Sequence, residues 1–359
     1  MKADGPRKGR GAVISPDGRF AAWRREVADD GWWNDEDDAA SAATELIVDS
    51  AKSVITYNTS PDIPYDRSIN PYRGCEHGCA YCFARPSHAW LGLSPGLDFE
   101  TKIAYKADAA DCLRRELAKP GYVCRPIALG INTDAWQPVE RRLRVTRGIL
   151  EVLAETRHPV TIVTKSALIL RELDLLAELA QAGRVHVAVS ITTLDAGLAR
   201  AMEPRAPSAQ RRLAVIAALA AVGIPTAVMV APLIPALSDH ELEAILGAAR
   251  EAGASAAGYI LLRLPHEVKP LFRAWLQAHV PQRMAHVYSL MRQLHGGREY
   301  DSSFGTRQRG SGPLAEIIAQ RFRIAVRRLG LDAPTPPLDV TAFRPPSQPG
   351  TATPQLSLF

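Results

Sequence analysis

Short apolar runs alternate with segments of helical periodicity between residues 53 and 265. Five runs are brief and rich in β-branched residues, as buried strands are: 126–131, 160–165, 185–191, 226–231 and 258–263. We expect one more strand just before Cys75. Between the runs, apolar residues recur at helical spacing in 144–157, 168–182, 209–222 and 239–252. This alternation predicts an α/β fold with a parallel sheet, whose six βα units form a barrel or an open partial barrel.

One uncharged stretch, from Leu213 to Ser238, is long enough to span a bilayer. Gly223, Ile224 and Pro225 divide it into an Ala/Leu-rich half and a β-branched half. A buried helix, a tight turn and a buried strand therefore explain the stretch better than a membrane span.

The two ends of the chain differ from the core that we expect at 53–300. Residues 1–52 predict a flexible arm, in which Asp29 to Asp38 surrounds Trp32 and Trp33 with acidic side chains. We interpret this as a solvated arm whose tryptophans pack on the core, with a partner contact as the alternative. Residues 301–332 predict a basic loop and helix, and 333–359 contain 7 Pro in 27 residues, which predicts a disordered tail.

The composition of the chain excludes two classes of protein. The chain has 359 residues, a formal net charge of +5 and 47% hydrophobic residues, which is a globular composition and excludes wholesale disorder. Its five cysteines are an odd number, which does not fit a secreted disulfide scaffold. The basic Arg298–Arg328 region is a candidate phosphate contact or a solvated helix face. Trp90, Trp136 and Trp275 are candidates to stack on bases, with packing in the barrel core as the alternative.

Three cysteines stand close together in Cys75-x3-Cys79-x2-Cys82, and Tyr81 directly precedes the third. Three thiolates on one tight loop can bind three irons of a [4Fe–4S] cluster, which leaves the fourth iron open to a substrate or cofactor. The alternative is a Cys3His zinc site with His77 or His88 as the fourth ligand. Zinc sites usually take two ligands from each of two knuckles, and the sequence offers no second knuckle.

The stretch GCEHGCAYCFARP, followed by NTDAWQPVE and TKS, resembles the radical S-adenosylmethionine (SAM) superfamily, and more narrowly its spore photoproduct lyase-like branch. The resemblance covers about residues 53–310. It implies a (βα)6 partial TIM barrel with the N-terminal arm, C-terminal helices and disordered tail appended. It also implies a [4Fe–4S] cluster on Cys75, Cys79 and Cys82, SAM as second cofactor, and reductive cleavage of SAM to a 5′-deoxyadenosyl radical.

Polar residues at the expected strand ends are candidates to bind SAM, since chemistry in such folds lies at the carboxyl ends of the strands. By resemblance, Ser190 and Arg205 contact the ribose and carboxylate of SAM, and Lys165 assists. The alternative is that the two cations are surface charges and the serine is a helix cap. The full candidate set is Tyr81, Asn132, Asp134, Lys165, Ser190 and Arg205.

One departure from the family concerns the hydrogen donor. The lyase uses a cysteine near the end of the second strand, but Gly130 to Asp134 contains none. Cys124 lies at the start of that strand, and Tyr259 begins the last one, so both are expected on the wrong side of the barrel. No catalytic residue is therefore assigned, and Cys112 and Cys124 are interpreted as buried small hydrophobic residues.

The chain ends in Gln355-Leu356-Ser357-Leu358-Phe359, which resembles the motif by which bacterial repair and replication proteins bind the β sliding clamp. Apolar anchors on a free tail suit a groove on a partner. The alternative is that these residues pack on the chain's own core. Clamp binding by Gln355, Leu356, Leu358 and Phe359 would bring the protein to DNA.

Together these features favour a radical SAM lyase-like enzyme in DNA repair or nucleic-acid modification, recruited by the sliding clamp. The alternatives are a radical SAM enzyme acting on RNA, a protein or a small molecule, and a non-catalytic Fe–S adaptor that binds the clamp. A reductase, flavodoxin or ferredoxin is expected to donate electrons. Oxygen-sensitive thiolates and a start without an apolar signal segment predict a cytoplasmic protein that does not bind membranes.

Overall fold

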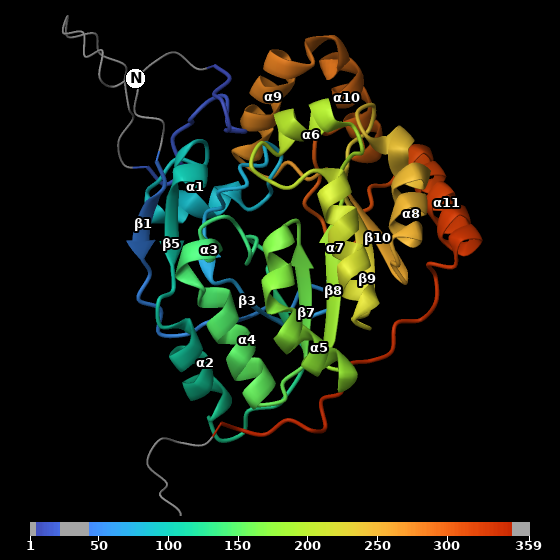
Figure 1. Cartoon of the computed structure of the whole chain (residues 1–359). Helices are drawn as coiled ribbons and strands as arrows, with labels where there is room; N and C mark the ends of the chain where they lie inside the picture. Colours follow the sequence, from blue (N-terminus) through green and yellow to red (C-terminus); the bar gives the residue numbers. More distant parts are fainter. Residues whose placement is uncertain (1–4, 22–42, 347–359) are drawn as a thin grey trace, which may run out of the picture.

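The computed structural model describes residues 5–21 and 43–346, and a seven-stranded sheet lies at its centre (Figure 1). The strand order is β10-β9-β8-β7-β6-β3-β2. Neighbours from β3 to β10 are parallel, while β2 runs antiparallel to β3 at the edge. These parallel strands confirm the predicted α/β partial barrel. The strands are β2 (Ile55–Tyr57), β3 (Arg67–Ile69), β6 (Ile127–Leu129), β7 (Val160–Thr164), β8 (Val185–Ser190), β9 (Thr226–Leu233) and β10 (Ala256–Leu261).

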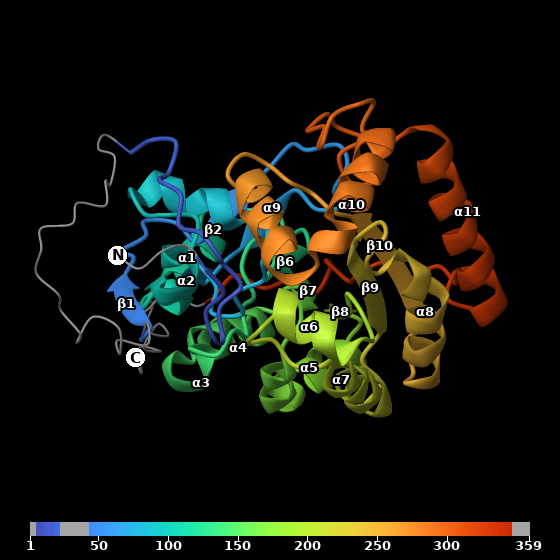
Figure 2. The same ribbon diagram turned by 90° about the horizontal axis from the view of Figure 1, so that it is seen from above.

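Helices connect the successive parallel strands and cover one side of the sheet (Figure 2). Burial alternates along β7 and β8, whose inward residues are Val, Ile or Thr, as expected for β-branched side chains on a pleated surface. The predicted helix at 168–182 begins as a 3-10 segment, because the Ser166 side chain caps Leu168 there (3.2 Å). The connecting helices are α4 (Val145–Glu155), η3 (Ala167–Glu172), α5 (Leu173–Gln181), α6 (Ala196–Met202), α7 (Ala209–Ala221), η4 (Asp239–Glu241) and α8 (Leu242–Glu251).

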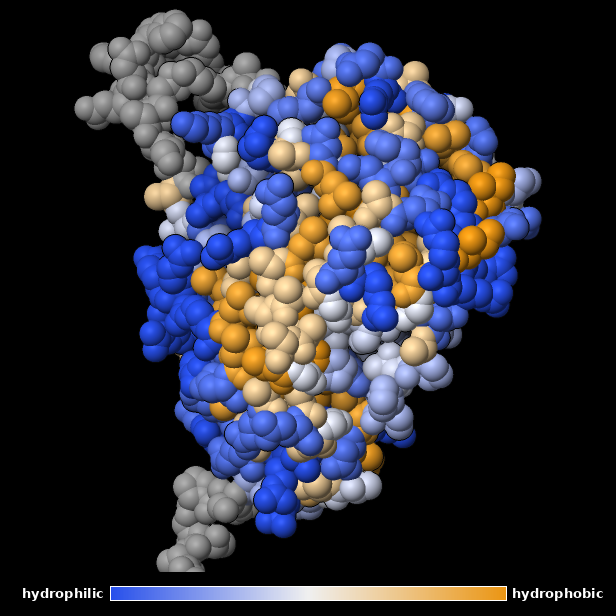
Figure 3. Space-filling model, turned by 45° about the vertical axis from the view of Figure 1, so that its right-hand side comes forward, coloured by the Kyte–Doolittle hydropathy of each residue, from blue (hydrophilic) through white to orange (hydrophobic). Residues whose placement is uncertain are grey.

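The stretch from Leu213 to Ser238 folds as the end of α7, a turn at Gly223 (φ 76°) and β9, as predicted. Within the described ranges, no helix is long and apolar enough to cross a membrane. The outer side of α7 is rich in alanine, and Ala214, Ala217 and Ala221 are exposed. Figure 3 shows the face to which α7 belongs, where a band of hydrophobic side chains is flanked by hydrophilic ones.

A second, three-stranded sheet lies beside the barrel in the order β1-β5-β4. Its strands are β1 (Glu45–Val48), β4 (Tyr72–Arg73) and β5 (Lys102–Tyr105). β1 belongs to the region that the sequence predicts as a flexible arm, yet it pairs in parallel with β5 from Glu45 to Val48. Unpaired backbone groups at a sheet edge bind another strand readily, which is why this short segment is recruited.

Residues 5–21, which we call the N-terminal strap, also lie on the core instead of extending from it. Ala12 and Val13 are buried, and the Gly11 backbone packs directly on the backbone of Gly78. Glycine permits this approach because a Cβ at residue 11 would lie 1.8 Å from the Gly78 oxygen. Trp32 and Trp33 lie outside the described residues.

The C-terminal part adds three long helices and a segment that runs back along the fold. Residues 333–346 are not disordered as predicted: the Arg344 N–H donates to the Thr156 carbonyl (2.9 Å), and the Phe343 ring packs on Tyr122 and His158. Aromatic packing and backbone pairing therefore outweigh the proline-rich composition here. The remaining helices of the fold are α1 (Asp98–Thr101), α2 (Ala109–Leu117), α3 (Glu140–Leu143), η2 (Arg85–Leu91), α9 (Val268–His279), α10 (Pro281–Leu294) and α11 (Gly312–Leu329).

Candidate functional site

The three clustered cysteines lie on a tight loop, residues 74–82, between β4 and η2. Gly74 (φ 84°) and Gly78 (φ 65°) adopt left-handed backbone conformations that bend the loop. The Cys75 N–H donates to the Phe99 carbonyl (2.9 Å), and the Ala80 N–H donates to the Met202 carbonyl (2.9 Å). Met202 ends α6, which follows β8, so the second bond ties the loop to the carboxyl end of the sheet.

The cysteine loop fits the cluster that the sequence predicts. All three thiols are free, and Cys75 and Cys79 are buried. Burial, assisted by the Glu203 charge, raises the pKa of the Cys79 thiol to about 12. Burial also raises the pKa of Cys75, with smaller contributions from Asp134 and from the nearby Cys79 and Cys82 thiols. Three adjacent thiolates in such a place need a cationic partner, and iron supplies one.

Across the described part of the chain, no group of three or more His, Cys, Asp or Glu side chains is placed to hold a single metal ion. A four-iron cluster binds each thiolate at a different iron, so this finding does not conflict with the cluster. The two histidines considered as zinc ligands have other partners. His88 Nε2 lies 2.9 Å from the Lys102 carbonyl, and His77 Nδ1 lies 3.6 Å from Asp134.

A buried arginine frames the outside of the cysteine loop. The Arg85 guanidinium donates to the carbonyls of Gly78 (3.2 Å) and Cys79 (2.9 Å) and pairs with Glu100 (2.5 Å). Both charged side chains are 0% exposed. Such a pair is stable only with further hydrogen bonds, and the Gly11 and Ala12 N–H groups provide them to Glu100 (3.1 and 2.8 Å).

A second buried network holds Tyr81. Its hydroxyl donates to the Glu203 carboxylate and lies 3.2 Å from Thr192 Oγ1, while Glu203 pairs with Arg212. Burial alone would raise the pKa of Glu203, but Arg212 and Lys165 outweigh it and lower that pKa to about 2. Glu203 is therefore ionised, and its carboxylate accepts the hydrogen bond that the Tyr81 hydroxyl donates.

Asp134 connects the carboxyl end of β7 to the cysteine loop. Its carboxylate accepts from the Thr164 hydroxyl (2.8 Å) and the Lys165 N–H (2.7 Å), and it lies 3.6 Å from His77 on the cysteine loop. The Lys165 ammonium donates to the Ala231 carbonyl (3.2 Å) and lies 5.9 Å from the centre of the Tyr81 ring. Tyr81, Asp134 and Lys165 are thus brought together beside the cysteines.

The other three predicted SAM contacts lie near the same end of the sheet, but each has a partner other than Asp134 or Lys165. Arg205 pairs with Glu76 of the cysteine loop (3.3 Å), and the carbonyl of buried Ser190 accepts from Arg212 (2.9 Å). Asn132 is held by its backbone, whose N–H donates to the Asn70 side chain (2.9 Å). The roles of all six residues as SAM contacts stay predictions. Gln355, Leu356, Leu358 and Phe359 lie outside the described residues.

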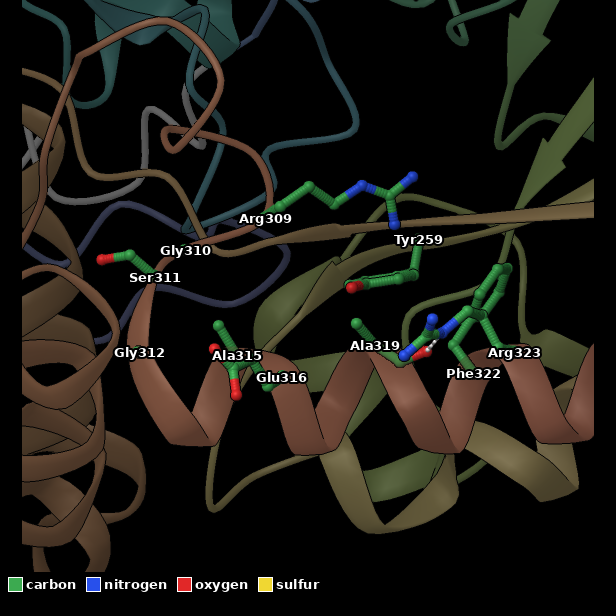
Figure 4. Close-up of a pocket in the computed structure, with 10 residues that line it drawn as sticks. All are labelled: Tyr259, Arg309, Gly310, Ser311, Gly312, Ala315, Glu316, Ala319, Phe322 and Arg323. Carbon is green, nitrogen blue, oxygen red and sulfur yellow. Dashed lines mark hydrogen bonds between the residues drawn. The ribbon is translucent and has the colours of Figure 1, made fainter.

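The residues considered as alternative hydrogen donors lie away from the cysteine loop. Cys124 precedes β6, at the amino end of the sheet. The Tyr259 ring points away from the barrel toward α11, where it packs on Phe322 (4.8 Å) and under the Arg309 guanidinium (4.0 Å). Figure 4 shows these side chains in a groove of about 610 Å³ between β10 and α11.

The tryptophans considered for base stacking separate into two groups. Trp90 is 68% exposed, whereas Trp136 and Trp275 are 0% exposed. The rings of Trp136 and Trp275 therefore fill the core, which is the alternative to base stacking, and they do not face solvent.

Sequence reasoning missed the partners that hold the loop, which are Arg85, Glu100, Glu203 and Arg212. A weak signal exists for Arg85, a charged residue three positions after Cys82 with a proline behind it. Glu100 gives no such signal, because the backbone N–H groups that donate to it belong to the N-terminal strap, almost ninety residues earlier. Glu203 and Arg212 look in the sequence like ordinary charges at helix ends, and only their burial shows otherwise.

Comparison with known proteins agrees with this geometry. The family model described as the radical SAM superfamily matches residues 69–249. An uncharacterized protein of Mycobacterium bovis is 40% identical over 233 residues, which cover 64% of this chain and 68% of the relative. An uncharacterized protein of Methanocaldococcus jannaschii is 28% identical over 197 residues, which cover 55% of this chain and 71% of that protein.

Solved structures of spore photoproduct lyase share the fold. A cysteine-to-serine mutant of that lyase superposes with a TM-score of 0.60 and 15% identity, covering 87% of this chain and 86% of the lyase. The lyase complexed with dinucleoside spore photoproduct gives a TM-score of 0.57 and 17% identity, covering 79% of each chain. The matched family, the sheet and the buried three-cysteine loop agree: this chain belongs to the radical SAM superfamily, and it is an enzyme whose cofactors are a [4Fe–4S] cluster and SAM.

Proposed function

We propose that this enzyme abstracts a hydrogen atom from a nucleic-acid substrate and acts in DNA repair or nucleic-acid modification. Cys75, Cys79 and Cys82 would hold the cluster, which when bound would supply the electron for reductive cleavage of SAM. The chain's own residues hold the reactants in place. Glu203 and Thr192 fix the Tyr81 ring, and Asp134 orders the backbone at the end of β7. Arg205 and Lys165 supply positive charge for the carboxylate of SAM.

The observation that carries the nucleic-acid proposal is a set of three arginines, each of which lies over an aromatic ring. We call these residues the arginine–aromatic rim. Phe83 directly follows Cys82, so the rim begins at the cysteine loop. Proteins bind single-stranded nucleic acid with this combination, because bases stack on aromatic rings and arginines contact phosphates. The pairs are Arg263 over Phe83 (4.7 Å), Arg307 over Phe304 (4.8 Å) and Arg309 over Tyr259 (4.0 Å). The Tyr259 ring is buried, so the third pair offers a ligand its exposed arginine and not its ring.

The basic loop of the rim connects the two edges of the seven-stranded sheet. At one edge, the Leu261 N–H at the end of β10 donates to the Gln308 carbonyl (2.9 Å). At the other edge, Arg307 pairs with Asp62 (2.5 Å) and donates to Ser60 (2.6 Å), both in the β2–β3 connection. Substrate that enters the open side of the barrel therefore meets this loop.

The likeness to spore photoproduct lyase supports a nucleic-acid substrate for this fold, since three of the similar lyase structures contain a dinucleoside spore photoproduct. The same reaction is not proposed here. Residues 130–134 contain no cysteine in the place of the lyase's hydrogen donor. We propose a different donor, and thus a different lesion or modification.

Recruitment by the β sliding clamp is the second part of the proposal. The C-terminal QLSLF supports it, as apolar anchors at a chain end. Because residues 333–346 lie on the fold, the motif is joined to it by residues 347–354 alone. That linker reaches at most about 30 Å, so the clamp would hold the enzyme close.

Production of 5′-deoxyadenosine by anaerobically reconstituted, reduced protein tests the substrate class. We expect DNA to stimulate the wild type and Cys79→Ala to give no product. Arg263→Ala and Arg309→Ala should abolish stimulation by DNA and leave the DNA-free rate unchanged. Stimulation by RNA in place of DNA would refute the role in DNA repair. Stimulation by a protein extract or small metabolites alone would contradict the nucleic-acid proposal, and so would rim variants that respond to DNA like the wild type.

Binding of the purified clamp tests recruitment separately. Wild type should bind, and Leu358→Ala with Phe359→Ala should not. Thr351→Ala with Thr353→Ala is the matched control, since it changes two neighbouring residues outside the motif. Equal binding by all three proteins would refute clamp recruitment and leave the proposed chemistry untouched.

A further inference from the structure

The N-terminal strap and η2 together form the outer surface above the cysteine loop. At the strap, Gly11 packs on Gly78 so closely that a single methyl group would not fit, and Val13 joins the apolar cluster that contains Cys79 and Tyr81. Farther along, Gly18 packs on buried Ala89 of η2, where a Cβ at residue 18 would lie 2.9 Å from the Ala89 Cβ. The strap is thus one layer of chain between solvent and a cluster ligand.

Hydrogen bonds run without interruption from this layer to the Cys79 backbone. The Gly11 and Ala12 N–H groups donate to Glu100, Glu100 pairs with Arg85, and Arg85 donates to the Cys79 carbonyl. Every one of these groups belongs to a buried residue. Electrons cross bonded, well-packed protein more readily than gaps, so these hydrogen bonds offer a continuous route to the cluster.

Two large aromatic side chains are exposed on the same surface. Trp90 is 68% exposed and Phe20 is 48% exposed. Their ring centres lie 4.1 Å apart, and the Arg19 guanidinium lies 4.7 Å from the centre of the Phe20 ring. Arg19 is itself fixed by Glu267 (2.9 Å). A rigid, solvent-exposed cluster of tryptophan, phenylalanine and arginine has the composition of a protein-binding hot spot.

The excess of basic residues on this surface indicates what kind of partner it binds. The strap contains Arg7, Lys8, Arg10 and Arg19 against the single acid Asp17. Arg7 and Lys8 are exposed. A basic surface around an apolar centre attracts an acidic protein and guides its approach.

We propose that this surface, formed by the strap and by Trp90 of η2, docks an acidic protein that carries single electrons, such as a flavodoxin. In the transfer, an anionic flavin hydroquinone loses one electron and becomes the neutral semiquinone, with no proton released. The [4Fe–4S] cluster gains that electron, its charge falls from 2+ to 1+, and no bond forms or breaks. This inference rests on membership of the family and not on the proposed substrate.

Two electron sources in one assay test the docking surface. The holoenzyme cleaves SAM with electrons from flavodoxin, kept reduced by NADPH and its reductase, or from dithionite, which needs no docking. We expect Arg7→Glu with Lys8→Glu, and separately Trp90→Ser, to lower the flavodoxin-driven rate about tenfold or more at limiting flavodoxin. The dithionite-driven rate should stay within twofold of wild type. The flavodoxin-driven rate of the wild type should also fall as salt rises, because charge guides the encounter.

Matched variants separate docking from general damage. Lys52→Glu with Lys119→Glu makes the same charge change at two exposed lysines distant from the strap, and Tyr57→Ser removes another exposed aromatic ring. Both should keep the wild-type rate with flavodoxin. The proposal is overturned if the strap variants keep that rate, if these controls lose it equally, or if the dithionite-driven rate falls in parallel. The last result would make the strap a structural cover. DNA plays no part in this assay, so failure of the nucleic-acid proposal leaves its result unaffected.

Discussion

Replacing Arg85 by Met is expected to weaken the fold around the cysteine loop more than any ordinary surface change. The guanidinium is completely buried and donates to four carbonyls, those of Gly78, Cys79, Pro95 and Gly96, besides pairing with Glu100. Met has a similar length and no charge, so it fills much of the space and removes every one of these hydrogen bonds. The change therefore isolates the polar contribution from packing.

The expected loss in the free energy of unfolding follows from the buried groups that Arg85→Met leaves without a partner. The Glu100 carboxylate would stay buried with the Gly11 and Ala12 N–H groups still donating to it, and removing one partner of a buried ion pair costs about 3–5 kcal/mol. Carbonyls that lose a buried donor add about 1–3 kcal/mol each, less where water or neighbours adapt. We expect the free energy of unfolding to fall by at least about 4 kcal/mol, with a matching loss of iron after reconstitution.

Chemical denaturation of four proteins measures this: wild type, Arg85→Met, Glu100→Gln and the double variant. Because the two side chains form one pair, the double variant should be less destabilised than the sum of the singles by about 1–3 kcal/mol. Arg73→Met is the control, since Arg73 makes a partly exposed pair with Asp49 and should cost under about 1 kcal/mol. Additive effects, or a cost for Arg85→Met no greater than for the control, would refute the reasoning.

Three further changes test other parts of the structure. Gly11→Ala should release the strap, because its Cβ would lie 1.8 Å from a carbonyl oxygen of the cysteine loop. The rate of hydrogen exchange in residues 5–21 should then rise. Gly247→Ala is the control: it has open space around it and should leave that rate unchanged. Burial lowers the pKa of His158 to about 4 against the usual 6.5, so the unfolded chain binds a proton that the folded chain does not. Stability should therefore fall by about 3 kcal/mol as the pH drops from 7 to 4, and a thermal melt series should show this loss in wild type but not in His158→Gln. Phe343→Ala should free residues 333–346, which faster tryptic cleavage at Arg344 would reveal; an unchanged cleavage rate would show that the backbone contacts suffice.

The parts of the molecule that the sequence predicted well are those whose signal is local. β7 and β8 were visible as short β-branched runs, and the Gly223 turn as a break between two apolar halves. The cysteine loop was visible because its ligands and bends lie within eight residues of one another. In each case the residues that produce the structure are neighbours in the chain.

The parts that escaped prediction depend on contacts between distant residues. Polar, glycine-rich residues such as those of the strap usually stay solvated, and their docking is decided by the Glu100 carboxylate about ninety residues later. Likewise, nothing near Phe343 indicates that Tyr122 and His158 provide a surface for its ring. The role of Glu203 and Arg212 could be recognised only in the folded structure. Their burial as an ion pair is what places the Glu203 carboxylate against the Tyr81 hydroxyl.

The strap also sets an order of events during synthesis. Its Arg19 pairs with Glu267, which is made 248 residues later, so the ribosome must complete most of the barrel before the first residues of the chain can take their final place. Throughout that interval Gly11 and Ala12 can already bind Glu100, while the Arg19 end of the strap has no partner. A cluster delivered during this period would meet a strap that is fastened at one end, and the arrival of Glu267 would fix the other.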